Sequence, residues 1–419
     1  MAEQAPAAEP VRKQRWPRYV AYGVAGGVTV IAAAGAIVLG PAGPNLAAAL
    51  SNNRDVWRLG KLNVEGVQGR GLGDLQVTRA TLSDDQGVWA IAEDVRVKWE
   101  PLKLLAGDVA LRNVGADKLI ILRRPNLAPA KDSGPVTLDT DVAAIGIERV
   151  EIANGVAGPA ALFKFTGAVV TRRGSIDALR VDFTRQDAPL DSLKINFAKA
   201  PNLTLDAALT GKPGGTFSYL IEAPKADLEA RARATTDPNG SGAASLVATL
   251  GAMTAAQGNL AWSTADWRLA GVVHFDAIPV ASDLAKRFGP VAELSASGAA
   301  PKPAGAPFSA VLASQSLSGE ARGKLDDELK AVGAVALVLS TQRFGQLVPE
   351  TDLEAGGARF DGAIEFEGDR TRLSGRAALD GWRRNGFDSR QAKAPPLPPA
   401  NGIVAGFSLD EMLGNGAPA

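Results

Sequence analysis

One pattern fills most of the sequence between residues 54 and 389: short runs in which apolar and polar residues alternate, separated by Gly, Asn, Asp and Pro. Successive side chains of a β-strand point to opposite faces, so period-two runs indicate strands with one apolar and one polar face. In the run 87–99 the apolar positions are Trp89, Ile91, Val95, Val97 and Trp99. Similar runs occur at 145–152, 160–170, 178–185, 192–198, 202–210, 227–235, 258–275, 309–325, 331–341 and 358–380.

The spacing of these runs predicts how the strands connect. One strand in about 8–15 residues, with turn residues between, leaves little room for the crossover helices of a parallel sheet. We therefore predict a mostly β fold, a long antiparallel β-meander with few short helices. The helical exceptions are a turn at 102–105 and a helix at 279–288, which starts with Pro and stops at Gly289. Residues 126–135 and 299–307 are predicted loops.

The N-terminal region carries a different signal. No residue between Arg18 and Arg54 is charged, and residues 19–39 read YVAYGVAGGVTVIAAAGAIVL. At 1.5 Å per residue this run forms a helix of roughly 31 Å, close to the ~30 Å hydrocarbon thickness of a bilayer. Basic residues and Trp16 precede it, as expected on the cytoplasmic side. These features predict a membrane span.

The expected organisation follows from that span. Residues 1–18 form a cytoplasmic basic tail, residues 19–39 a transmembrane signal-anchor helix, residues 54–389 a β-rich domain outside the cytoplasm, and residues 390–419 a Pro-rich, disordered tail. Two alternatives to the anchor stay open. Small residues at 47–49 offer a cleavage site for a signal peptide, and the run could be a buried helix of a soluble domain.

Composition excludes several classes of protein. Lys+Arg 45 balance Asp+Glu 45, and the pI is near 6.7, so the chain lacks the basic surface of a nucleic-acid binder. With no Cys it forms no disulfide, thiolate nucleophile, iron–sulfur cluster or Cys-type zinc site. A single His does not supply a multi-histidine metal centre. We therefore expect no metal and no cofactor.

No motif of a known catalytic site is present. The sequence lacks a G-x-S-x-G elbow, a Walker A loop and an H-E-x-x-H helix, so we expect no catalytic residues and no enzyme activity. His274 lies in an apolar strand-like run and is interpreted as structural. The pairs 84–85 and 326–327, both Asp-Asp, are interpreted as solvated turns. The glycine-rich stretch 66–74 precedes another strand, which favours a hairpin or bulge over a dinucleotide loop.

Residues 56–125 combine four short motifs. They are G-x-x-G-x-G-L-G at 66–73, D-x-x-G-x-W at 84–89, D-V-x-V-x-W-x-P-L-x-L-L-x-G at 94–107 and R-R-P at 123–125. Together they resemble the N-terminal portion of the TamB family, the translocation and assembly module subunits, within the wider AsmA-like group.

The resemblance implies a location, a fold and a function. It implies an anchor in the bacterial inner membrane, single-pass, with the bulk of the chain in the periplasm as an elongated β-groove (β-taco-like) with an apolar interior. It also implies transport of phospholipid, whose acyl chains would occupy the groove, and a part in protein secretion and outer-membrane assembly with the outer-membrane barrel TamA. Trp89, Ile91, Val95, Val97 and Trp99 are the predicted apolar groove lining. The alternative is a non-transporting envelope scaffold that binds proteins by β-strand addition.

The chain departs from the family in length. TamB-type proteins run well beyond a thousand residues and end in a distinctive β-domain that meets the outer-membrane partner, whereas this chain has 419 residues and ends in a Pro-rich tail. At about 4.8 Å per strand, roughly 20 strands would extend near 100 Å. We therefore expect a truncated or split gene product, or a short relative that hands its cargo to another component, such as a separate C-terminal TamB partner.

Overall fold

A computed structural model describes residues 54–55, 60–69, 73–106, 108–126, 139–172, 175–327, 329–347, 356–367, 370–380, 383–384, 387–388 and 407–408. The fold is mostly β, with 66% of the described residues in strands, as predicted. The predicted tail 1–18, the predicted transmembrane helix 19–39 and nearly all of the tail 390–419 lie outside the described residues. In the described ranges, none of the helices has both the length and the apolar character needed to cross a bilayer.

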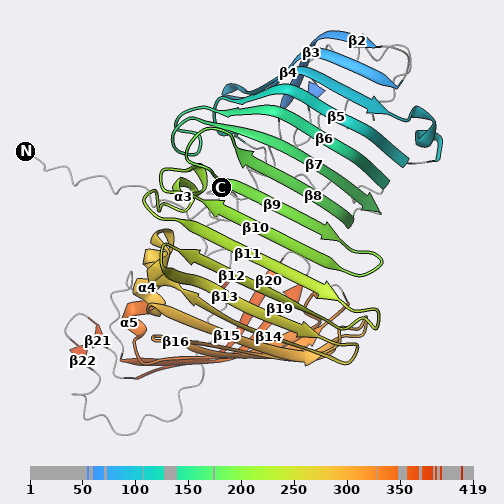
Figure 1. The fold of residues 1–419 in the computed structure, drawn as a ribbon. Helices are drawn as coiled ribbons and strands as arrows, with labels where there is room; N and C mark the ends of the chain where they lie inside the picture. The colour runs from blue at the N-terminus through green and yellow to red at the C-terminus, as the bar shows by residue number, and fades with distance from the viewer. Residues whose placement is uncertain are drawn as a thin grey trace, which may run out of the picture. The chain divides into compact units, whose positions relative to one another are not determined.

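The contacts within the chain divide it into two compact units, Met1–Ser175 and Ile176–Ala419, here called unit 1 and unit 2. Each unit is built around a β-sheet (Figure 1). The elements of unit 1 are β1 (Arg54–Asp55), β2 (Lys61–Gly69), β3 (Asp74–Asp84), β4 (Gly87–Trp99), the 3₁₀ helix η1 (Pro101–Ala106), β5 (Asp108–Ile121), β6 (Asp139–Ile152) and β7 (Ala161–Arg172).

The prediction of a wholly antiparallel meander is wrong at one place in unit 1. Strand β5 pairs with β6 in parallel, with Val114 opposite Ile145 and Leu119 opposite Val150. The other strand pairs of the unit are antiparallel. A parallel pair needs a crossover of a dozen or more residues, and residues 122–138 provide it. The predicted loop at 126–135 lies in this connection, but its length alone did not reveal the direction of the next strand.

The strands of unit 1 also contain irregular points at which their alternation shifts. On β4, Ala92 and Val95 are both buried although they differ in parity, and Asp94 between them has φ 51°. On β2, Gly66 has φ +66° next to the buried Val64. The pairing register is the same before and after both residues, with Glu65 opposite Arg79 and Val67 opposite Val77, so neither residue is a β-bulge. The glycine-rich stretch 66–74 spans the end of β2 and the start of its antiparallel partner β3, so the predicted hairpin is confirmed.

The apolar side chains of unit 1 form a packed core. Val114, Val142 and Phe163 have exposed fractions of 0%, and most of the fully buried apolar residues of the described chain belong to this unit. Val, Ile and Phe are large or β-branched side chains that pack well on a pleated surface. Burial of each contributes about 1.5–3 kcal/mol to folding.

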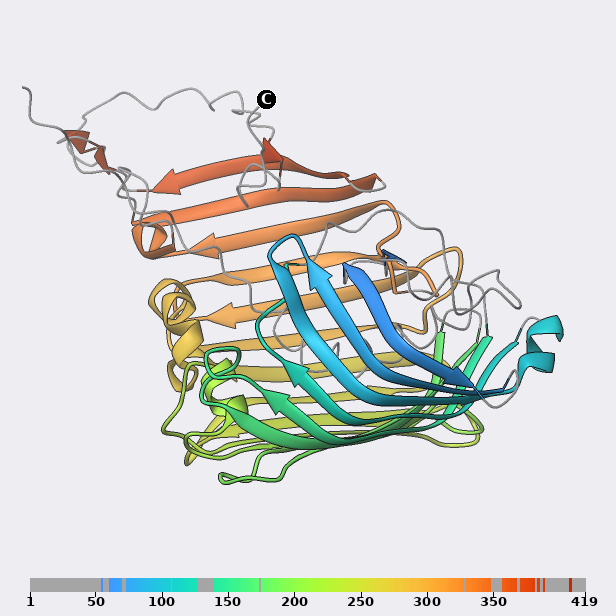
Figure 2. The same cartoon turned by 90° about the horizontal axis from the view of Figure 1, so that it is seen from above.

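Unit 2 contains a run of consecutively paired antiparallel strands, β8 to β20. Figure 1 superimposes β12 and β13 on β19 and β20, whereas Figure 2 shows these two groups apart, so the sheet of unit 2 bends. The strands are β8 (Ser175–Arg185), β9 (Ser192–Ala198), β10 (Thr204–Gly211), β11 (Leu228–Thr236), β12 (Gly242–Leu250), β13 (Met253–Trp262), β14 (Asp266–His274), β15 (Val291–Ala299), β16 (Ala306–Ser314), β17 (Ser318–Leu325), β18 (Ala334–Thr341), β19 (Gly357–Glu367), β20 (Arg370–Asp380), β21 (Arg383–Arg384), β22 (Phe387–Asp388) and β23 (Phe407–Ser408).

Most predicted strands of unit 2 are confirmed, and β9 matches its predicted bounds. The run 258–275 contains the end of β13 and all of β14, which are joined by a turn at Ser263. Strands β12 and β15 were not predicted. Their sequences, GAASLVATL and VAELSASGA, mix Ala, Ser and Gly on both faces, so the contrast between apolar and polar positions is weak.

Short helices lie along one margin of the unit 2 sheet, at one set of strand ends (Figure 1). They are α3 (Thr216–Leu220), η2 (Phe275–Ala277), η3 (Pro279–Ala281), α4 (Ser282–Phe288) and α5 (Phe344–Leu347). The predicted helix 279–288 is confirmed as η3 followed by α4, and it ends at Gly289 with φ 92°. A buried cluster of Phe217, Leu228, Leu250 and Ala277 packs at this margin.

Asp191 fastens α3 to this margin. Its carboxylate is fully buried and accepts the backbone N–H groups of Lys212 at 2.8 Å and Thr216 at 2.5 Å. The guanidinium of Arg185 lies 3.8 Å away. A Cβ at Gly215 would approach the carboxylate oxygens to 2.1 Å, so glycine is needed at that position. Because these groups satisfy the carboxylate, Asp191 is a structural residue.

Candidate functional site

The five side chains that the sequence predicts to line a groove all lie on β4 of unit 1. Trp89, Val95 and Val97 are buried, with exposed fractions of 3%, 4% and 1%, and Ile91 and Trp99 are half-buried. Ile91 lies between the buried Ala90 and Ala92, so alternation places it on the face opposite those two. Trp89, Val95 and Val97 therefore pack in the core of unit 1, and the lining of a groove by these five side chains stays a prediction.

The motif residues of the same region meet one another in unit 1. Asp84, of the D-x-x-G-x-W motif, is paired with Arg123, of the R-R-P motif. The Arg123 guanidinium also donates to the Gly87 carbonyl at 2.6 Å, and the Asn126 N–H donates to Asp84 at 2.6 Å. These hydrogen bonds, led by those from Arg123, lower the pKa of Asp84 to about 2.

These contacts join the motif residues to one another, so their role in unit 1 is structural. The carboxyl group of Asp84 is buried, so the interpretation of Asp84 as a solvated turn residue is wrong. A second link joins two further motifs, because the Trp99 N–H donates to the carbonyl of Gly73 at 2.9 Å. His274 ends β14, where it pairs with Val291. Among the described residues, no three His, Asp or Glu side chains gather as a metal site.

The most continuous apolar surface lies instead in unit 2. Residues directly opposite each other on paired antiparallel strands share a face, so the strand registers can be followed from β8 to β20 as rows across the sheet. The first apolar row is Leu179, Phe197, Leu205, Ala234, Ala244, Leu260, Leu269, Ala296, Ala310, Ala321, Leu337, Gly362 and Gly375. The thirteen described strands add no polar residue to it.

A second row runs beside the first, two residues along each strand and on the same face. The second apolar row is Val181, Ile195, Ala207, Ala232, Leu246, Gly258, Gly271, Leu294, Leu312, Gly319, Leu339, Phe360 and Ala377. It also contains no polar residue in these strands. We call the two rows together the apolar face of unit 2.

The row between them, on the opposite face, is different in character. It contains Arg180, Asn196, Asp206, Arg233, Ser245, Asn259, Ser295, Glu320, Asp361 and Arg376, interrupted by Ala270, Val311 and Val338. Arg233 and Asp206 form an exposed ion pair across this row at 3.8 Å. In these three rows the sheet of unit 2 is thus amphipathic over thirteen strands, with the charged residues on one side.

The side chains of the apolar face of unit 2 are more exposed to solvent than those in the core of unit 1. Most of its members are half-buried, and Leu246 and Leu294 are 45% and 41% exposed. Val114 and Val142 of unit 1, by contrast, are fully buried. A continuous exposed apolar patch of this kind is rare on a soluble monomer and is typical of a surface that contacts a membrane, a ligand or a partner.

Two glycines on this side of the sheet lie directly opposite aromatic side chains of the neighbouring strands, where a larger residue would clash with the ring. A Cβ built on Gly298 would meet the indole of Trp267 at 2.8 Å, and one built on Gly323 would meet the ring of Phe308 at 3.0 Å. Trp267 is directly opposite Gly298 on the neighbouring strand. Aromatic side chains that cover a glycine on the adjacent strand are a known device for stabilising sheets.

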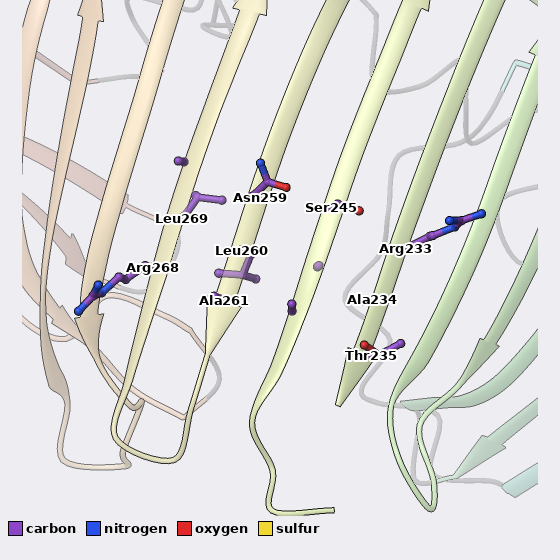
Figure 3. A pocket seen from close by; sticks show the side chains of 12 residues that line it. Arg233, Ala234, Thr235, Ser245, Asn259, Leu260, Ala261, Arg268 and Leu269 are labelled. Carbon is purple, nitrogen blue, oxygen red and sulfur yellow. The ribbon is translucent and has the colours of Figure 1, made fainter. Parts of the chain in front are cut away.

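One cavity of about 570 Å³ is associated with β11 to β14. Four of its lining residues belong to the first apolar row, Ala234, Ala244, Leu260 and Leu269, and the other eight are their neighbours along each strand, which belong to the opposite face. Figure 3 shows Arg233 and Arg268 at opposite margins of the lined area. A volume of this size is within the range of sites that bind small molecules.

Comparisons with models of known families, with curated proteins and with solved structures found no match for this chain. The resemblance of residues 56–125 to the TamB family therefore stays a prediction. The apolar face of unit 2 is the feature that sequence reasoning missed. Its signal was present in runs such as LEARARATT (228–236), in which small apolar and charged residues alternate strictly.

Proposed function

We propose that this chain is an inner-membrane-anchored, periplasmic TamB-like protein that carries phospholipid along the apolar face of unit 2. In this role it takes part in outer-membrane biogenesis and in protein secretion, translocation and assembly, with the barrel TamA or a separate C-terminal TamB partner as the receiving component. The observation that carries the proposal is the pair of apolar rows that cross thirteen strands without a polar side chain.

Simple energetics support an acyl chain as the ligand. Each CH₂ group that leaves water for an apolar surface contributes about 0.8 kcal/mol, and this contribution needs no directed hydrogen bond. Thirteen strands spaced about 4.8 Å apart give a contour of roughly 60 Å along the sheet. Because the rows hold only Ala, Gly, Val, Leu, Ile and Phe, the interaction is similar at each strand, so a chain can move along the face without a deep trap.

Adjacent residues on opposite faces provide a matched test. Leu246 and Val247 are 45% and 46% exposed, both are apolar, and only Leu246 belongs to the apolar face. A photoreactive amino acid is placed at either position of the full chain in intact cells, and the crosslinked species is identified by mass spectrometry. The proposal expects phospholipid adducts at Leu246 and none at Val247. Equal lipid labelling at both positions, or none at either, would contradict it.

The same experiment discriminates the alternative function, a scaffold that binds proteins by β-strand addition. The observation that favours this alternative is the outer side of β20, which among the described residues pairs only with the two-residue strand β23. A scaffold would give protein adducts at positions along β20, such as Ser374, and no lipid adduct at Leu246. Lipid at Leu246 together with an unlabelled Ser374 favours transport.

A further inference from the structure

The strands that carry the apolar face of unit 2 end in an apolar cluster on one side. The short helices lie at these strand ends (Figure 1), and we call this side the helix margin. The buried side chain of Phe217, from α3, packs there in one cluster with Leu228 and Leu250. Three side chains that continue the apolar face by a further row pack against this cluster: Phe183, Leu193 and Leu209. The helix margin is therefore closed by packed hydrocarbon.

The opposite strand ends carry a row of aromatic residues and glycines on the same side of the sheet as the apolar face. Across β12 to β17 this row reads Gly242, Trp262, Trp267, Gly298, Phe308 and Gly323. Each member lies two residues along its strand from the first apolar row, and the three aromatic side chains are half-buried. Beyond the row the strands are joined by the connections 237–241, 263–265 and 300–305, which are mostly exposed. We call this side the Trp margin.

We propose that a phospholipid lies on the apolar face parallel to the strands, with its headgroup at the Trp margin and the ends of its acyl chains at the helix margin. The inference rests on the proposed function and adds the orientation of the ligand. An indole has an apolar body and one polar N–H, so Trp262 and Trp267 suit the boundary between hydrocarbon and water. A phosphate placed against the buried cluster at the helix margin would lose its hydration.

The distance between the two margins suits one acyl chain. On β13, six residues separate Trp262 from Ala256, which belongs to the row next to the helix margin. At about 3.3 Å per residue this separation is roughly 20 Å. Half of a ~30 Å hydrocarbon core, the thickness that the acyl chains of one leaflet fill, is roughly 15 Å. A lipid in this orientation can step sideways by ~4.8 Å to the next strand while its headgroup stays at the same margin.

Two alanines of β12 provide matched positions for a test, because the chain has no Cys of its own. Ala244 and Ala248 are both half-buried and both on the apolar side, but Ala244 is nearer the Trp margin and Ala248 nearer the helix margin. Ala244→Cys or Ala248→Cys is made in the full chain and labelled with a small thiol-reactive fluorophore. Ala243→Cys, at an exposed position on the opposite face, is the control.

The quenchers are two forms of phosphatidylethanolamine, with a nitroxide either on the headgroup or at the methyl end of one acyl chain. Each is mixed with the labelled chain, which an amphipol keeps in solution, and the loss of fluorescence is measured. Positions 244 and 248 lie about 13 Å apart along β12, so we expect the headgroup nitroxide to quench position 244 about threefold more than position 248. The acyl-chain nitroxide should reverse that order, and position 243 should stay at background with both.

The outcomes separate this inference from the proposed function. If both quenchers act equally at positions 244 and 248, and more than at position 243, phospholipid lies on the face without the proposed orientation. Stronger quenching of position 248 than of position 244 by the headgroup nitroxide would place the headgroup at the helix margin and overturn the inference. Quenching at none of the three positions, or equal quenching at all three, would overturn the proposed function and this inference with it.

Discussion

Units 1 and 2 both place apolar residues on one face of a sheet, but they fill that face with different side chains. In unit 1 the buried positions hold mainly Val, Ile and Phe, and Val114 and Phe163 are fully buried. In unit 2 the two apolar rows hold Ala, Gly and Leu at most positions, and Leu246 stays 45% exposed. Alternation is common to both units. The size of the residues at the apolar positions therefore distinguishes a packed core from an open surface.

The strands of the two units also differ in regularity. Register shifts interrupt the strand pairs of unit 1 near Leu82, Lys98, Val142 and Ile147, and β6 joins β5 in parallel. In unit 2 the registers that define the apolar rows run from β10 to β17 with one recorded shift, at Ala248 and Thr249. Bulges bend a strand and increase its twist, which favours closure of a sheet over its own core, whereas regular ladders extend a surface.

The largest expected difference between the units concerns a buried charge. Val97→Asp puts a carboxylate at a site that is 1% exposed, and we expect it to lower the free energy of unfolding of unit 1 by about 3–5 kcal/mol. Leu246→Asp, at a half-exposed site, should change it by only about 0.5 kcal/mol while reducing lipid labelling. Denaturant unfolding of the full chain, followed by circular dichroism, measures both. Similar losses of stability would erase the distinction between core and open face.

The next effect belongs to the margin of unit 2. Asp191→Ala leaves the buried N–H groups of Lys212 and Thr216 without their acceptor, so we expect a loss of about 2–4 kcal/mol. Asp187→Ala serves as the control, since Asp187 also pairs with Arg185 but is 40% exposed. It should cost less than about 1 kcal/mol. Hydrogen exchange in α3 would localise the change, and a stable, protected α3 in Asp191→Ala would show that the carboxylate is dispensable.

Two glycines on this side of the unit 2 sheet differ in the space that an added side chain would find. Gly298 is covered by an aromatic ring, whereas Gly258 is not. Gly298→Ala would bring a methyl group to 2.8 Å from both the Trp267 indole and the Pro307 carbonyl, and we expect it to cost about 1–3 kcal/mol. At Gly258 the nearest atom is 3.5 Å from the added Cβ, so Gly258→Ala should be neutral or slightly stabilising, by about 0.5 kcal/mol. Thermal unfolding compares the two variants. Equal unfolding midpoints would argue against close packing of the Trp267 indole on Gly298.

The smallest predicted effect is a pH dependence confined to unit 1. The hydrogen bonds from Arg123 lower the folded-state pKa of Asp84 from its ordinary value of 3.8 to about 2. A lowered pKa contributes stability that is complete above pH ~4 and is lost as the pH falls towards 2, here roughly 1–2 kcal/mol. Arg123→Met should lower stability at pH 7 and weaken the dependence between pH 4 and 2. If wild type and variant lose stability in parallel over this window, another carboxylate is responsible.

Several structural features could be predicted from local sequence because they depend on neighbouring residues. The strand at 192–198, the helix ending at Gly289 and the glycine-rich hairpin at 66–74 each follow from periodicity or from the conformational freedom of glycine. Pairing direction did not follow in the same way. The parallel entry of β6 depends on where the chain returns after residue 122, and nothing in the sequence of β6 itself records that.

In the candidate site, too, the local alternation could be predicted from the sequence, whereas burial and strand alignment could not. Alternation correctly placed Val95 and Val97 on a common apolar side, but burial is a property of everything packed around a side chain, and these two are covered. Strands β12 and β15 escaped prediction because Ala, Ser and Gly carry little contrast. Once their registers join them to β11, β13, β14 and β16, the apolar rows become continuous across them.

What the sequence by itself determined is the mostly β character of the chain and the amphipathic nature of its strands, because both depend on a period of two residues. The tertiary structure alone decided the register that aligns Leu269 with Ala296, the parallel pair in unit 1, and which apolar face is packed and which is open. The physical reason is that exposure and alignment depend on neighbours distant in sequence, whereas alternation is set by the geometry of a single strand.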